Sequence, residues 1–123
     1  MKGFSAAAVD EALERLQQER LLDDRRFAEH FTEQALESHR FAGQRLCQEL
    51  RRRGVNGDIV ASVTAAGRET HDESEGVAAL LERRFPAFRW QASDEREKRR
   101  IISFLQRRGY AMNVILQVMR STA

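Results

Sequence analysis

An internal repeat constrains the fold of this chain more than any other feature of its sequence. An apolar residue, a free position, two arginines, a glycine and an apolar residue occupy positions 50–55, and the same order returns at 105–110. Further apolar positions match at the same offset of 55 residues: 59, 60 and 63 against 114, 115 and 118. A pattern that recurs at a fixed spacing is typical of tandem repeat proteins. Because one unit of about 50 residues buries little surface, we expect neighbouring units to stack into an elongated, curved array.

Each unit is predicted to consist of three short amphipathic helices. Apolar residues recur at helical spacing, and the pattern predicts helices at 5–22, 24–38, 42–53, from 56–58 to the polar segment 67–73, and at 74–85, 94–108 and 112–120. Asp23 and Asp24 are expected to end the first helix and to cap the second. Gly54 and Gly109 suit the left-handed position after a helix. One proline and seven glycines leave few turn residues for a sheet protein, so the predicted class is all-α.

The start of the chain carries only the end of the repeating unit. Gly3 and Phe4, followed by apolar positions 8, 9 and 12, fit the pattern that begins at Gly54. We therefore expect a truncated first repeat whose last helix lies within 1–22, a second three-helix repeat at 23–68 and a third at 69–123. The apolar stripe of the first helix is expected to pack on the following unit or to stay partly exposed.

The remaining composition argues for a cytoplasmic protein without a metal centre. Cys47 is the single cysteine, so the chain can form no internal disulfide and has no cysteine cluster for zinc. It lies on a helical apolar stripe, and we expect it to be a small packed residue. No run approaches the roughly 20 apolar residues of a membrane span, and the N-terminus has no apolar signal segment.

No catalytic motif is present. The sequence has no phosphate-binding glycine loop, no dinucleotide fingerprint and no paired zinc histidines. Its three histidines, at 30, 39 and 71, are not spaced to share a helical face. The carboxylate pairs Asp23-Asp24 and Asp94-Glu95 lie at predicted helix starts, where capping explains them. We therefore expect neither an enzyme nor a bound cofactor or metal.

Charge alternates along the chain. Net charges of −4 and −5 fall on residues 1–37 and 69–82, whereas 38–68 and 83–123 carry +4 and +7. Of the 21 cationic residues, 19 are arginine. Arginines of the two matching basic helices are predicted to line an outward stripe that binds a partner or a nucleic acid: Arg45, Arg51, Arg52, Arg53, Arg96, Arg99, Arg100, Arg107 and Arg108.

Two interpretations of this stripe stay open. Arginine can reflect a GC-rich genome, with these side chains serving as solvated faces and as cations that suit helix C-termini. Alternatively, the repeated stripe meets polyanions or an acidic protein surface, because guanidinium groups bind phosphate and carboxylate bidentately. The glycine-containing helix junctions are also found in DNA-binding helix-turn-helix proteins, but short helical bundles share them.

Three motifs resemble those of one bacterial family. They are Leu22-Asp23-Asp24 with Phe27-Ala28; Gly43, Leu46, Glu49-Leu50 and Gly54-Val55; and Ile102, Phe104-Leu105 and 107–110 with Ile115. In combination they resemble the RecX family, regulators of the recombinase RecA. The resemblance covers nearly the whole chain and implies tandem three-helix repeats.

The resemblance also implies a function. A RecX-like protein is expected to bind the RecA nucleoprotein filament in its helical groove, without a cofactor, and to inhibit filament extension, ATP hydrolysis, strand exchange and coprotease activity. That role belongs to the regulation of DNA repair and recombination. The alternatives are a helical protein that binds single-stranded or duplex DNA directly, without RecA, and a plain helical scaffold.

Overall fold

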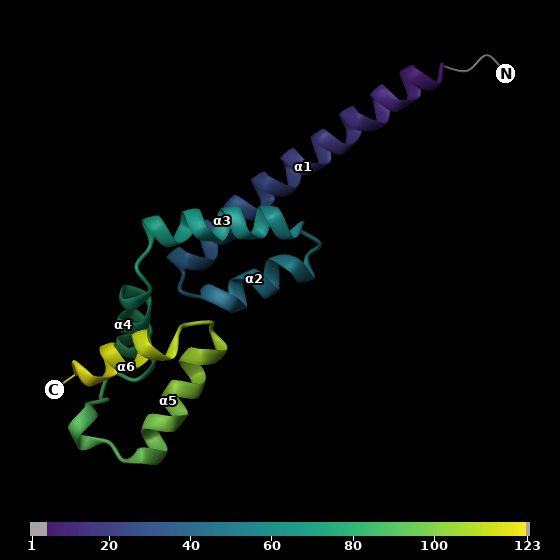
Figure 1. Cartoon of the computed structure of the whole chain (residues 1–123). Coiled ribbons are helices and arrows are strands. Elements are labelled where there is room, and N and C mark those ends of the chain that lie inside the picture. The colour runs from purple at the N-terminus through teal and green to yellow at the C-terminus, as the bar shows by residue number, and fades with distance from the viewer. Residues whose placement is uncertain (1–4, 123) are drawn as a thin grey trace.

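The computed structural model describes residues 5–122, and this part consists of α-helices and one short 3-10 turn, with no strand. Figure 1 shows an elongated molecule in which one long helix projects at one end and the last three helices gather at the other. The predicted all-α class is therefore confirmed. Gly3 and Phe4, which the repeat pattern includes, lie outside the described residues.

The helix boundaries follow local sequence signals. The elements are α1 (Ala6–Glu37), α2 (Gly43–Arg52), α3 (Gly57–Thr70), α4 (Glu73–Arg84), the 3-10 turn η1 (Trp90–Ala92), α5 (Glu95–Arg107) and α6 (Met112–Arg120). Side chains of Asn56, Asp72 and Asp94 cap α3, α4 and α5 by accepting from backbone N–H groups. Gly54 and Gly109 follow α2 and α5 with φ of +85° and +103°, as their predicted role requires.

The predicted break at residues 22–24 is wrong. Helix α1 continues through Asp23 and Asp24 for 32 residues, so the boundary expected between the first and second repeats falls inside a helix. Aspartate costs only about 0.7 kcal/mol in a helix interior relative to alanine, and positions 5–42 contain no glycine or proline to interrupt the backbone. Arg25 and Glu29 form an i,i+4 ion pair at 3.7 Å just after the aspartates.

Two apolar cores divide the molecule. The first joins the second half of α1 to α2 and α3, with Leu50 and Val60 fully buried, and Cys47 packs against it as predicted. The second joins α4, α5 and α6. The connection after α4 adds Phe88, which is 3% exposed, to this second core. Leu36 at the end of α1 packs against both cores, so the two units share a boundary.

The first half of α1 projects from the molecule (Figure 1). Its apolar residues are largely exposed, with Leu13 at 54% and Leu16 at 61%. Of the two outcomes expected for this stripe, exposure is the one observed. Within residues 5–122, no helix is both long enough and apolar enough to cross a membrane.

Candidate partner-binding interface

Glu49 organises the arginines of the second unit. It lies on α2, is only 5% exposed, and its carboxylate accepts from Arg45 Nε at 3.0 Å and from Arg53 Nη1 at 2.6 Å. Arg52 Nη1 lies 3.5 Å from the same carboxylate. Three of the arginines predicted to face a partner are thus engaged within the chain.

The electrostatics of Glu49 follow from these neighbours. Hydrogen bonding from Arg53 is the largest effect on the pKa of Glu49, and with hydrogen bonding from Arg45 it holds that pKa below the ordinary value of 4.5, against the opposing effect of burial. The carboxylate is therefore ionised at neutral pH. Its negative charge offsets part of the positive charge that the sequence places on α2.

Aromatic rings hold two of these arginines from the other side. The guanidinium carbon of Arg53 lies 4.5 Å from the ring centre of Phe31, and that of Arg45 lies 5.1 Å from the ring centre of Phe41. The two rings stack with their centres 6.3 Å apart. Because each guanidinium is held between a carboxylate and a ring, Arg45 and Arg53 have fixed positions.

The predicted arginines also join the two units. Arg45 Nη1 donates to the carbonyl oxygen of Arg107 at 3.2 Å. In the opposite direction, Arg108 Nη1 donates to the carbonyl oxygens of His39 and Arg40 at 3.4 and 3.5 Å. Arg45, which is predicted on the outward side of its helix, keeps 38% of its side chain exposed and also reaches the third unit through this contact.

Glycines permit this close approach. Gly43 has a φ of +47°, and a Cβ there would lie 2.5 Å from the carbonyl oxygen of Gly109. A Cβ on Gly109 would overlap the carbonyl oxygen of Ala42. The backbones of the loop before α2 and the turn after α5 are therefore in direct contact, which only residues without a side chain allow.

A groove of about 800 Å³ runs beside this contact, between α2 and the turn that joins α5 to α6. We call it the inter-repeat groove. Four arginines line it: Arg45, Arg51, Arg68 and Arg107. Gln44, Gln48 and Gln106 also line it, and Glu73 is the single acidic residue of the lining. Such a surface offers many hydrogen-bond donors to carboxylate or phosphate oxygens.

The structure thus separates the predicted stripe into three groups and Arg108, which is bonded to the loop after α1. Arg51 and Arg107 are exposed in the inter-repeat groove, together with Arg68, which the sequence prediction missed. Arg52, Arg53 and Arg45 gather on Glu49. The three arginines in the first half of α5 are exposed and do not line the groove: Arg96, Arg99 and Arg100.

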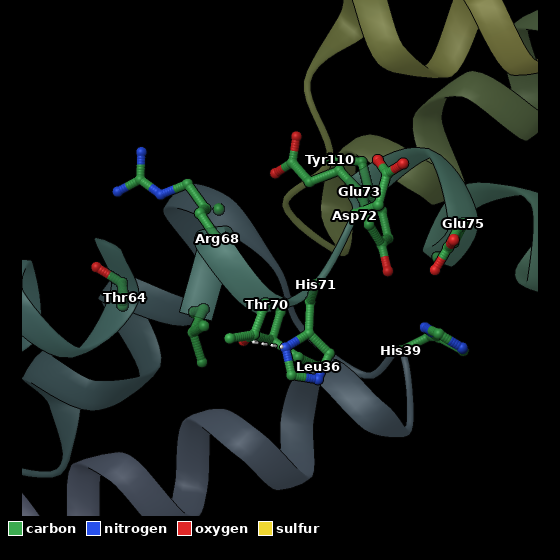
Figure 2. Close-up of a pocket in the computed structure, with 13 residues that line it drawn as sticks. Leu36, His39, Thr64, Arg68, Thr70, His71, Asp72, Glu73, Glu75 and Tyr110 are labelled. Atoms are coloured by element: carbon green, nitrogen blue, oxygen red, sulfur yellow. Dashed lines mark hydrogen bonds between the residues drawn. The ribbon is translucent and has the colours of Figure 1, made fainter. Parts of the chain in front are cut away.

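A small cavity lies at the inner corner between α3 and α4 (Figure 2). Its volume of about 90 Å³ suits a few water molecules, whereas small-molecule sites typically have 300–1,000 Å³. Thr70 Oγ1 and His71 Nδ1 lie 2.9 Å apart at its edge. Tyr110 and Glu73 also line the cavity. Burial is the main reason that the pKa of Tyr110 is raised to about 12, and the charge of Glu73 adds to the effect.

Across residues 5–122, no three histidine, cysteine or acidic side chains are grouped so that they could hold a metal ion.

Comparison with known proteins identifies the family. The model of the RecX second three-helix domain matches residues 23–63, and that of the RecX third three-helix domain matches 72–119. The chain is 43% identical over 117 residues to the regulatory protein RecX of Trichlorobacter lovleyi, which covers 95% of this chain and 76% of that protein. The chain belongs to the RecX family.

The chain is also similar to RecX proteins of other bacteria. The regulatory protein RecX of Syntrophotalea carbinolica is 34% identical over 116 residues, covering 94% of this chain and 76% of that protein. The RecX of Mycobacterium sp. strain JLS is also 34% identical, over 123 residues that cover 95% of this chain and 65% of that protein. RecX proteins are regulatory proteins and not enzymes. No solved structure matches the chain.

The RecX domain matches can be placed on the helices. The second-domain match begins inside α1, so it includes the buried half of this helix and leaves out the projecting half. The third-domain match spans α4, α5 and nearly all of α6. The inter-repeat groove therefore lies between two RecX domains.

Sequence reasoning could have found Glu49. It lies four residues from both Arg45 and Arg53, a spacing that places all three on one helical face. No comparable signal exists for Arg68, because its place in the groove depends on how α3 packs beside α2.

Proposed function

We propose that this RecX-family protein binds RecA filaments and inhibits RecA activities, namely filament extension, ATP hydrolysis, strand exchange and coprotease activity. Membership of a family of regulatory proteins supports the proposal. The observation that carries the choice of surface is the inter-repeat groove, where Arg51 and Arg107 are exposed on two different units.

The groove suits an acidic protein surface. Arg51 and Arg107 make no ion pair within residues 5–122, so their guanidinium groups can take carboxylates of a partner. Both belong to units that are joined through backbone contacts, which fixes the spacing between them. A partner that contacts both arginines therefore binds a surface that is already ordered, which lowers the entropic cost of binding.

The elongated array supplies the proposed mechanism of inhibition. A chain that contacts two neighbouring filament subunits at once resists the subunit movements that filament growth and ATP turnover require. Arg45, Arg53 and Arg108 act in this proposal by holding the groove in shape, whereas Arg51 and Arg107 contact the partner. Arg52, which is 74% exposed, lies at the edge of the Glu49 cluster.

The proposal is tested by measuring RecA-catalysed ATP hydrolysis on single-stranded DNA in the presence of this protein. We expect the pair Arg51→Glu and Arg107→Glu to raise the concentration needed for inhibition by roughly tenfold or more, because charge reversal repels an acidic partner. The matched control reverses two exposed arginines of α1, Arg15→Glu and Arg20→Glu, and keeps inhibition. Equal inhibition by the groove variant and the unaltered protein contradicts the assignment of the groove.

A further inference from the structure

Four arginines gather at the boundary between the two units, where α4 and α5 end beside the loop after α1. We call them the junction arginines: Arg40, Arg83, Arg84 and Arg108. They come from the loop after α1, the last turn of α4 and the end of α5. Only Arg108 belongs to the stripe that the sequence predicts. The other three lie on other elements, and tertiary packing brings them beside it.

Phe104 is the centre of this cluster. The guanidinium carbons of Arg84 and Arg108 lie 5.4 and 5.0 Å from its ring centre. Arg108 is also bonded to the carbonyl oxygens of His39 and Arg40, which fixes it between the two units. The cluster is therefore a built feature of the fold and not a set of independent surface side chains.

The junction arginines have no acidic partner. Within residues 5–122, the cations that form ion pairs are Arg25, Arg45, Arg52, Arg53 and Lys98. Burial is the main reason that the pKa of Arg108 is lowered, and the charges of Arg84, Arg83 and Arg40 lower it further, while Tyr110 opposes them. The four cations thus repel one another, and a bound anion would relieve this repulsion.

Helix ends alone do not explain the cluster. A helix C-terminus favours nearby cations, which accounts for Arg83 and Arg84 at the end of α4. It does not account for Arg40, which lies beyond the last turn of α1 and whose charge acts on Arg108. Arginines from α4 and from the end of α5 meet on one aromatic ring, and the charge of Arg40 acts on Arg108 beside them, which points to a ligand with several negative groups.

Aromatic and cationic side chains continue along α5. Arg100, Phe104 and Arg108 follow one another at intervals of four residues and so share one side of the helix. Arg100 stacks on Phe85 with 5.8 Å between its guanidinium carbon and the ring centre, and Phe85 meets Phe104 edge-on at 5.6 Å. Both rings are partly buried and border the surface that carries the arginines.

We propose that the junction arginines and Phe104 form a binding site for the phosphodiester backbone of single-stranded nucleic acid. Guanidinium groups bind phosphate oxygens bidentately, and aromatic rings and guanidinium planes stack with unpaired bases. A row of cations suits the regularly spaced charges of a nucleic acid strand. The contact requires no RecA, so the site is independent of the function proposed above.

The test is the fluorescence anisotropy of a labelled oligothymidylate titrated with the full chain, without RecA, at two salt concentrations. We expect the pair Arg83→Ala and Arg84→Ala to raise the dissociation constant by roughly tenfold and to make the slope of log affinity against log salt shallower by about 1.4, the value for two lost phosphate contacts on a single strand. The pair Arg83→Lys and Arg84→Lys, which keeps both charges, is expected to retain most of the salt dependence. Circular dichroism establishes that each variant folds.

The control is Arg15→Ala with Arg20→Ala, which removes the same charge from the projecting half of α1 and is expected to leave the dissociation constant within about twofold. Equal losses in this control and in the junction variant would overturn the site. Absence of binding at low salt, or tighter binding of a duplex of the same length, would overturn the single-strand assignment. Displacement of the oligonucleotide by polyglutamate as effective as that by unlabelled oligothymidylate would identify an acidic polypeptide as the ligand instead.

Discussion

The backbone N–H of Ala42 donates a hydrogen bond of 2.8 Å to the carbonyl oxygen of Arg108. This bond joins the loop before α2 to the end of α5 and so connects the two RecX domains. The last carbonyl groups of a helix have no N–H donor within it, so Ala42 supplies the donor that the carbonyl oxygen of Arg108 lacks. Gly43 and Gly109 lie on either side of this bond, so substitution of a glycine tests the contact between the domains directly.

Gly109→Ala is expected to destabilise the chain far more than Gly54→Ala. Both glycines close matching helices with positive φ, so each substitution carries the cost of a left-handed alanine, about 1–2 kcal/mol. A Cβ at Gly109 also overlaps Ala42, whereas nothing lies within 4 Å of a Cβ at Gly54. We expect an additional loss of roughly 2 kcal/mol for Gly109→Ala, measured by urea denaturation. Equal losses at the two positions would show that the junction contributes nothing to stability.

Glu49→Gln is expected to lower the free energy of unfolding at pH 7 by roughly 1–3 kcal/mol, because Arg45 and Arg53 lose their shared carboxylate. The control Glu29→Gln removes an exposed ion pair and is expected to cost less than about 1 kcal/mol.

The pH dependence of stability tests the same carboxylate. The pKa of Glu49 in the folded chain lies below 4.5, so its contribution is present above that value and is lost as the pH falls through the folded pKa. The stability difference between the unaltered chain and Glu49→Gln should therefore shrink under acid. A difference that is constant from pH 7 into the acid range contradicts the role of the ionised carboxylate.

Tyr110 is expected to ionise near pH 12 in the folded chain, because burial against Gly76 and the charge of Glu73 disfavour the phenolate. It is the only tyrosine, so absorbance near 295 nm reports it alone. The unfolded chain should ionise near the ordinary value of 10.0. Since the folded pKa is raised, the stability contributed by the neutral phenol is present below pH 10.0 and is lost as the pH rises toward 12. The same midpoint for folded and denatured chains would contradict the buried position.

Hydrogen exchange should divide α1 into two parts. Amides of residues 9–20 are expected to exchange rapidly, because this half is exposed and an isolated helix of this length is marginal in water. Amides around Ala28 and Ala35, which are 0% and 4% exposed, should be protected up to the global unfolding free energy. Mass spectrometry of peptides from both halves measures the difference. Equal protection would mean that the projecting half is covered in solution.

Most of the helical architecture could be predicted from local patterns. The helix starts near Asn56 and Asp94 and the glycines after α2 and α5 depend on signals within a few residues, and the structure confirms them. The break at Asp23 was predicted from a capping residue, but an aspartate inside a run of helix formers costs too little to end a helix.

The candidate interface was less predictable. Helical periodicity places Arg45 and Arg52 away from the apolar side and within reach of Glu49, yet it does not say which side chains meet across the two units. Glu49 binds three arginines in and directly after α2, and the contact between units bonds Arg45 and Arg108 to backbone carbonyl oxygens of the opposite unit. Arg51 and Arg107 remain exposed in a groove that neither unit forms alone.

The sequence by itself determined the helices, their repetition and the supply of arginine, because periodicity, capping and charge are properties of neighbouring residues. Only the tertiary structure decided which arginines share the inter-repeat groove and which gather without a counter-charge around Phe104. The physical reason is that both groupings depend on distances of a few ångströms between side chains of different elements. Those distances are set by the packing of the two units, where Gly43 and Gly109 allow the backbones to touch.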